Sequence, residues 1–392
     1  MPVRATKRGD ERTPLHGDFD VLICGASFAG LAVARELAGS GADVLIIDRY
    51  EIGERQTSAC AAPTEWLTNL GLDASIRQTF GELLVHSPGR SYRWPLPFTF
   101  STFDYRTLCE LLWQQASAGG DVRFETAKVE GITRGGDDHV VHTDRGDLSA
   151  PLVVDGLGWR RVLGDLDGAT VQPPDARLSR GLEIHPDDPN PPSPDLTLFL
   201  DRRYVRSGYS WSFPADGELR VGVGSFDPRY HVKAPTLALA EAEGLPAERF
   251  QGNWIPHELR PATQNGIFFV GDSAGHCLPT TAEGIRTALY FGLACGRELR
   301  AVIEGRRTRE QALAGYGAFS DRHGRAFRWL LKVQDMVGHV VGRERLLRLI
   351  LSTVSRPWLV RPFFERYLAV APPDFALEGT PPTSDARASV AA

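Results

Sequence analysis

Residues 18–48 read DFDVLICGASFAGLAVARELAGSGADVLIID and decide the fold. The apolar run over 18–25 is of the kind that forms a buried parallel strand and ends on a glycine. Apolar residues at helical spacing over 31–38 predict a helix, which a Gly-Ser-Gly segment then ends. The apolar run over 43–48 predicts a second strand. A strand, a helix and a strand within about 30 residues predict a parallel sheet of the Rossmann type.

The turn between the first strand and the helix is Gly25-Ala-Ser-Phe-Ala-Gly30. Such a turn lets the backbone approach a pyrophosphate, and the helix N-terminus offers it unpaired N–H groups. Ser27 stands where this motif usually has its middle glycine. Asp48 follows roughly 20 residues on, where a carboxylate can accept hydrogen bonds from a ribose. We predict dinucleotide binding by Gly25, Ala26, Ser27, Ala29, Gly30, Asp48 and Arg49.

Length and composition set the broad class. The chain has 392 residues, of which 42% are apolar and 24% charged, as in a soluble globular protein of two to three domains. Its five cysteines are scattered without a C-x-x-C pair, which argues against a disulfide framework or a zinc site and favours a reducing compartment. The first 17 residues lack the apolar core of a signal peptide, and no apolar run is long enough to span a membrane. We therefore expect a cytoplasmic protein without a metal centre.

A second glycine turn, Gly271-Asp-Ser-Ala-Gly-His276, also follows a buried strand and leads into Ala282-Glu-Gly-Ile285. A third motif, Val153-Val-Asp-Gly156, lies between the two turns. In this order the three motifs resemble those of the para-hydroxybenzoate-hydroxylase-like flavoproteins. The resemblance implies FAD as cofactor, with the ribityl chain on Asp272 and the flavin ring at the helix N-terminus. The cofactor contacts predicted in this part of the chain are Val129, Asp155, Gly156, Asp272, Gly284 and Ile285.

Within this group, Gly208-Tyr-Ser-Trp-Ser-Phe-Pro214 and Arg220-Val-Gly-Val-Gly224 are similar to segments of the geranylgeranyl reductases, which saturate isoprenoid double bonds. Alternate residues of a strand share one face, so Tyr209, Trp211 and Phe213 lie on the same side and are predicted to line the substrate pocket. Aromatic residues in such an alternating pattern are equally typical of the packed core of a sheet. Reductases of this family often carry a cysteine where Cys60 stands, so Cys60 is the predicted catalytic residue, with a buried packing role as the alternative.

The resemblance implies a flavoenzyme that adds a hydride and a proton to a double bond of a hydrophobic or lipid substrate. The electron donor would be NAD(P)H or a ferredoxin-like protein. A flavin monooxygenase is the chief alternative. A halogenase is disfavoured because no lysine lies between the first motif and Phe100, and a cyclase or a non-enzymatic flavin or lipid carrier is also less favoured.

The predicted fold class is α/β, with a Rossmann-like FAD-binding domain, an inserted mixed or antiparallel sheet that forms the substrate domain, and a helical C-terminal region. The FAD-binding domain is expected over 18–80, 104–165 and 259–305. The substrate domain is expected over 81–103 and 166–258, the helical region over 306–370, and disordered ends over 1–17 and 371–392.

The C-terminal region is basic on an otherwise acidic chain. Between Arg297 and Val370 there are 15 Arg and Lys against 7 Asp and Glu. Basic amphipathic sequence with aromatic residues suits the surface of an anionic bilayer, which predicts peripheral membrane contact. A helical cap with solvated arginines is the alternative. No recognition motif accompanies the charge, so we expect no nucleic-acid binding.

Overall fold

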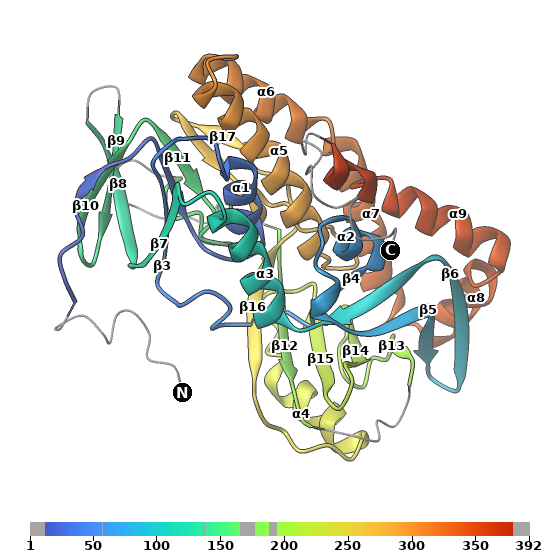
Figure 1. The fold of residues 1–392 in the computed structure, drawn as a ribbon. Helices are drawn as coiled ribbons and strands as arrows, with labels where there is room; N and C mark the ends of the chain where they lie inside the picture. Colours follow the sequence, from blue (N-terminus) through green and yellow to red (C-terminus); the bar gives the residue numbers. More distant parts are fainter. Residues whose placement is uncertain (1–11, 57, 136–137, 165–176, 188–193, 379–392) are drawn as a thin grey trace, which may run out of the picture.

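The computed structural model describes residues 12–56, 58–135, 138–164, 177–187 and 194–378. They form three sheets, and helices from the C-terminal part of the chain run along one side of the molecule (Figure 1). No helix in these ranges is long and apolar enough to cross a membrane.

A six-stranded sheet contains the predicted β-α-β unit. Its order is β17-β18-β11-β2-β3-β7, and its strands are parallel except for β17. The central strands are fully buried apolar runs, as expected of a parallel sheet covered on both faces. The strands are β2 (Val21–Cys24), β3 (Val44–Asp48), β7 (Val122–Thr126), β11 (Leu152–Asp155), β17 (Thr263–Gln264) and β18 (Ile267–Phe269).

Helices α1 (Phe28–Leu37) and α5 (Ile285–Ile303) pack closely against each other beside this sheet. Gly292 and Gly296 allow the approach, because a Cβ at Gly292 would lie 2.6 Å from the carbonyl oxygen of Ala29 and one at Gly296 would lie 2.7 Å from that of Val33. The seam brings the start of α1, after the first glycine turn, close to α5, after the second. Helix α3 (Tyr105–Ser117) packs against α1, and the Asp104 carboxylate caps its N-terminus by accepting from the N–H of Thr107.

An eight-stranded mixed sheet forms the second layer, in the order β16-β12-β15-β14-β13-β5-β6-β4. Its long hairpin, β5 and β6, begins at Ile76, before the predicted boundary at residue 81. Strand β12 and helix α4 (Lys233–Ala242) lie in stretches where the sequence predicted neither. The strands are β4 (Ala61–Pro63), β5 (Ile76–Ser87), β6 (Arg90–Phe103), β12 (Leu178–Ile184), β13 (Leu196–Phe199), β14 (Gly208–Pro214), β15 (Leu219–Ser225) and β16 (Gln251–Pro256).

A small third sheet has four strands in the order β1-β10-β9-β8 and contacts the six-stranded sheet. Its strands are β1 (Gly17–Asp18), β8 (Val129–Gly135), β9 (Asp138–Thr143) and β10 (Gly146–Ala150). Helix α2 (Thr64–Asn69) does not belong to this sheet and contacts the segment over residues 373–377.

The C-terminal helices are α6 (Arg309–Asp321), α7 (Gly324–Val340), α8 (Glu344–Val354) and α9 (Pro357–Leu368). Helices α8 and α9 reach the β5–β6 hairpin, where Figure 1 shows them at one edge of the molecule. The predicted disordered end begins too early. The short helix η5 (Pro373–Leu377) is ordered because the Phe375 ring packs against Tyr290 and Phe319, and Ala371 is fully buried. The rest of that segment, and residues 1–11, lie outside the described residues.

Candidate active site

Three glycine turns follow neighbouring parallel strands at the carboxyl edge of the six-stranded sheet. Gly25 follows β2, Gly156 follows β11 and Gly271 comes shortly after β18. A Cβ at Gly25, whose φ is 110°, would lie 2.3 Å from the carbonyl oxygen of Gly156. A Cβ at Gly30 would lie 1.9 Å from the carbonyl oxygen of Gly25. The edge is therefore a cradle of bare backbone of the kind that admits a pyrophosphate.

Asp48 stands at the end of β3, next to the first turn. Its carboxylate accepts hydrogen bonds from the backbone N–H groups of Ala26 at 2.9 Å and Tyr50 at 3.0 Å. Burial raises the pKa of Asp48, while these bonds oppose the rise. Each carboxylate oxygen has a second lone pair, so a ribose hydroxyl can still be accepted.

The other residues predicted at this end differ in exposure. Ala26 and Ala29 are buried in the turn, and Ser27 is half-buried, with its hydroxyl 3.3 Å from that of Tyr105. Arg49 is exposed and stacks on the Tyr50 ring. Val129 is buried at the start of β8, two residues after Ala127, whose N–H donates to the carbonyl oxygen of Asp48.

The turn after β18 connects the nucleotide edge to a cavity. A Cβ at Gly271 would lie 3.1 Å from Cβ of Ala29, and one at Gly284 would lie 3.8 Å from Oδ1 of Asp272. Burial raises the pKa of Asp272 to about 6, against the opposing charge of Arg260. Among the described residues no hydrogen-bond donor reaches the Asp272 carboxylate, which makes it the side chain here most in need of a ligand hydroxyl.

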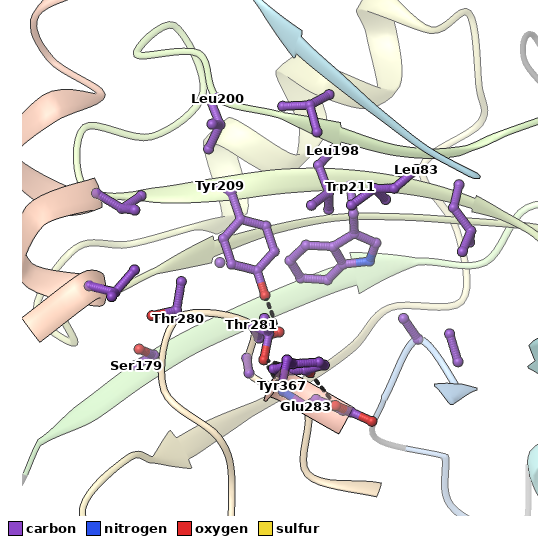
Figure 2. A pocket seen from close by; sticks show the side chains of 18 of the residues that line it. Leu83, Ser179, Leu198, Leu200, Tyr209, Trp211, Thr280, Thr281, Glu283 and Tyr367 are labelled. Carbon is purple, nitrogen blue, oxygen red and sulfur yellow. Dashed lines mark hydrogen bonds between the residues drawn. The ribbon is translucent and has the colours of Figure 1, made fainter. Parts of the chain in front are cut away.

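A cavity of about 680 Å³ begins at Gly284 and Ile285 and runs between the eight-stranded sheet and the C-terminal helices. The first N–H groups of α5 have no acceptor within the helix, so they are available to a group at this end. Most of the wall is aliphatic or aromatic, with side chains such as Leu198, Leu200 and Val337, and Figure 2 shows part of it. Its shape and lining suit a long apolar molecule.

The three predicted pocket residues, Tyr209, Trp211 and Phe213, all line this cavity from β14. They share a face because they alternate along the strand. The Tyr209 hydroxyl donates to the carbonyl oxygen of Thr281 at 2.5 Å, which ties β14 to the turn before α5 (Figure 2).

The loop around Cys60 also borders the cavity, but the Cys60 side chain is 0% exposed. Its φ of 52° is left-handed, which is rare for a residue with a Cβ. The thiol points to the carbonyl oxygen of Ser58 at 3.2 Å, and burial raises the pKa of Cys60 well above its usual value. The group is therefore a thiol, not a thiolate, at neutral pH.

Comparison with known proteins gives this geometry a context. A family model described as lycopene cyclase protein matches residues 20–213. The chain is 24% identical to digeranylgeranylglycerophospholipid reductase 2 of Methanopyrus kandleri over 381 residues, which cover 85% of this chain and 93% of that protein. It is 30% identical to geranylgeranyl diphosphate reductase of Rhodobacter capsulatus over 158 residues, 39% of this chain and 40% of that protein. The chain is thus similar, over most of its length, to reductases of the geranylgeranyl type.

Solved structures show the same fold. A geranylgeranyl bacteriochlorophyll reductase-like protein from Thermoplasma acidophilum superposes with a TM-score of 0.78 at 18% identity, covering 93% of this chain and 99% of that one. A probable FAD-dependent monooxygenase from Pseudomonas aeruginosa superposes with a TM-score of 0.65 at 18% identity, covering 86% of this chain and all of the other. The named relatives over most of the chain are reductases, so this protein is an oxidoreductase.

Asp155 was predicted to contact the cofactor, but its own partners already engage its carboxylate. Its side chain is fully buried, and both oxygens are engaged, one by the N–H of Leu157 and the hydroxyl of Ser273, the other by the N–H of Leu163. This geometry favours a brace between the turns after β11 and β18 over direct contact with a cofactor. The N–H of Gly156 donates to the carbonyl oxygen of Cys24 at 2.7 Å, which holds the turn after β11 against the end of β2.

The structure also places several residues that sequence reasoning missed at or next to the cavity. Glu283 and Arg286 form a buried ion pair at the start of α5, and the Tyr367 hydroxyl of α9 donates to Glu283 (Figure 2). Glu183 on β12 lies on the cavity wall. Only Glu283, inside the Glu-Gly-Ile motif, had a sequence signal. The others belong to elements whose proximity to the cavity depends on the tertiary fold.

Proposed function

We propose that this enzyme reduces carbon-carbon double bonds of a prenyl lipid or related isoprenoid, with FAD as its cofactor. The observation that carries the proposal is the track of residues from Asp48 past Asp272 to an apolar cavity at the start of α5, in which Gly271 lies beside Ala29 and Gly284 lies beside Asp272. The reductases named among its relatives support the substrate class.

The residues along the track fit FAD. Gly25 and Gly30 let the backbone turns approach each other more closely than a Cβ would allow, and Asp48 can accept from the adenosine ribose. The Asp272 carboxylate, which no hydrogen-bond donor among the described residues reaches, can accept from ribityl hydroxyls. The N–H groups of Gly284 and Ile285 would face the pyrimidine end of the ring, where the helix N-terminus favours negative charge. When bound in its reduced form, FAD supplies a hydride equivalent.

The cavity would hold the substrate by shape. An isolated double bond has no polar group for a protein to hydrogen-bond, so position must come from an apolar wall that follows the chain. Tyr209, Trp211 and Phe213 would form one side of that wall, and the C-terminal helices the other. Burial of the chain also excludes water from the reacting carbons.

Cys60 remains a candidate proton donor because its loop borders the cavity and its thiol keeps its proton. Efficient general acids have pKa values near the working pH, so a pKa held this high makes the thiol a slow donor. The electron donor, NAD(P)H or a ferredoxin-like protein, remains a prediction.

Contact with a membrane surface is proposed for α7, α8 and α9. Most of the large exposed apolar side chains lie there, among them Trp329 at 50%, Leu349 at 64% and Trp358 at 65% exposure. Arginines interleave with them in sequence, which suits an anionic bilayer. The cavity is lined by the same helices, so a lipid could enter from that side.

Dithionite-reduced protein mixed with a panel of prenyl lipids under anaerobic conditions tests the proposal. We expect products heavier by two hydrogen atoms for each bond reduced, with reoxidation of the flavin. A strict requirement for oxygen together with a product that gains oxygen would establish a monooxygenase instead. A product of unchanged mass would indicate a cyclase.

A further inference from the structure

We propose that Glu183, His185 and Glu218 carry protons into the cavity, and that Glu183 is the last carrier before the substrate. The inference rests on the proposed reduction of a double bond, which consumes one proton for each bond saturated. It assigns a catalytic role to Glu183 and positioning and relay roles to its neighbours.

The register of three strands holds Glu183 at the cavity wall. Trp211 on β14 pairs with Gly222 on β15, and Gly222 pairs with Glu183 on β12. A Cβ at Gly222 would lie 2.3 Å from the Trp211 ring, so the glycine lets the indole lie across the neighbouring strand. The indole Nε1–H then donates to Oε2 of Glu183 at 3.1 Å. The carboxylate is thus oriented by a residue that itself lines the cavity.

The second oxygen of Glu183 leads away from the cavity. Oε1 lies 2.9 Å from Nε2 of His185, and both side chains are only 4% exposed. Nδ1 of His185 lies 3.7 Å from Oε1 of Glu218, whose side chain is 20% exposed. An imidazole can take up a proton on one ring nitrogen and release one from the other, so the three groups join solvent to the cavity.

Arg220 positions the outer end of this path. Its Nε–H donates to Oε1 of Glu218 at 2.7 Å, and Nη1 donates to the carbonyl oxygens of Ala59 at 2.8 Å and Phe103 at 2.9 Å. Nη1 also reaches the carbonyl oxygen of Cys60 at 3.2 Å. The same buried guanidinium therefore supports both Glu218 and the Cys60 loop.

The proton balance of the reaction can be followed along this path. Saturation breaks the π bond and forms two C–H bonds, one from the hydride equivalent and one from a proton. Glu183 gives its carboxyl proton to the second carbon and becomes a carboxylate. It is reloaded from Nε2 of His185, which regains a proton at Nδ1 from Glu218, and Glu218 exchanges with solvent.

The variant Glu183→Gln tests the assignment, because an amide keeps the size and the acceptor for Trp211 but has no acidic proton. We expect kcat for prenyl reduction to fall about 100-fold, as for loss of a general acid, with KM within about twofold. Gln251→Ala is the matched control, since Gln251 pairs with Glu183 on the other side, also lines the cavity and is no part of the path. If Glu183→Gln does not fold, Glu218→Gln near the surface replaces it, with a smaller fall in kcat and a larger solvent deuterium isotope effect.

A second readout does not depend on turnover. The indole N–H resonance of Trp211, identified by its loss in Trp211→Phe, should shift with pH in the purified protein and lose that shift in Glu183→Gln. The other titratable or charged groups close to this site are Cys60, His185, Glu218 and Arg220. Cys60→Ala should therefore leave the pH-dependent shift in place.

The outcomes separate the two proposals. Wild-type kcat in Glu183→Gln, a loss no larger than in Gln251→Ala, or an unchanged Trp211 titration would overturn the proton path. A normal titration in a protein that reduces no prenyl substrate would leave the path standing and remove the proposed function. A large loss of kcat in Cys60→Ala together with none in Glu183→Gln would assign the proton to Cys60 instead.

Discussion

The guanidinium of Arg286 donates a hydrogen bond of 3.0 Å to the backbone carbonyl oxygen of Ala371. Arg286 lies in the first turn of α5, and Ala371 follows the end of α9. Further bonds from the same guanidinium reach the carbonyl oxygens of Tyr367 and Leu368, while Glu283 balances its charge. One buried cation therefore fastens the last helix to the turn beside which the flavin is proposed to lie.

Arg286→Met should lower the free energy of unfolding by about 3 kcal/mol, because it leaves the buried Glu283 carboxylate without its partner. Urea unfolding measures this. Arg361→Met is the matched control, since the pair of Arg361 with Glu365 is exposed on both sides and should contribute less than about 1 kcal/mol. Equal effects of the two substitutions would contradict the proposed bracing role.

Gly25→Ala should weaken FAD binding at least tenfold. The new methyl group would meet the carbonyl oxygen of Gly156 and push apart the two turns of the nucleotide cradle. Gly217→Ala is the control, because Gly217 also has a positive φ, 79°, but has nothing within 4 Å of the added methyl. The flavin absorbance bound per protein chain, measured after reconstitution, distinguishes them. Full FAD content in Gly25→Ala would argue against this cradle.

Asp272→Asn should stabilise the protein without cofactor yet weaken its binding of FAD. Burial raises the pKa of Asp272 to about 6, above its ordinary value of 3.8, so the charged form is the costly one. The cost appears as pH rises from about 4 through about 6 and is complete above that. At about pH 8 the variant should be more stable by about 1–3 kcal/mol. Urea unfolding of the apoprotein at two pH values checks this.

The difference in free energy of unfolding between Asp272→Asn and wild type should depend on pH in one direction only. It should shrink as pH falls below about 6 and vanish below about pH 3, where the wild-type carboxyl is protonated in both the folded and unfolded states. A variant that is less stable than wild type at about pH 8 would mean that the carboxylate has partners within the folded protein.

Trp358→Ala should reduce flotation of the protein with vesicles that contain anionic lipid, because Trp358 on α9 is 65% exposed beside arginines of the same helix. Leu237→Ala is the control, since Leu237 is exposed on α4, away from the basic helices. High salt should weaken binding of the wild type. If the wild type does not bind such vesicles at low salt, the proposed membrane contact of α7–α9 is wrong.

Local patterns were enough to predict much of the fold. The first strand, glycine turn and helix follow from apolar spacing and from Gly25, and the shared face of Tyr209, Trp211 and Phe213 follows from the two-residue period of a strand. Strand β12 was missed because the chain before and after it, over 171–194, is rich in proline, which hides a short strand. Its residues Glu183 and His185 therefore had no signal as part of a site.

The sequence by itself determined the class of fold and the glycine turns at the edge of the parallel sheet, because backbone turns depend on residues close together in the chain. The tertiary structure alone decided what surrounds the cavity. Trp211 meets Glu183 only because three strands are in register across Gly222, and α9 closes the cavity only because Arg286 binds its end. Such contacts join residues far apart in sequence, and packing of whole elements, not local preference, brings them together.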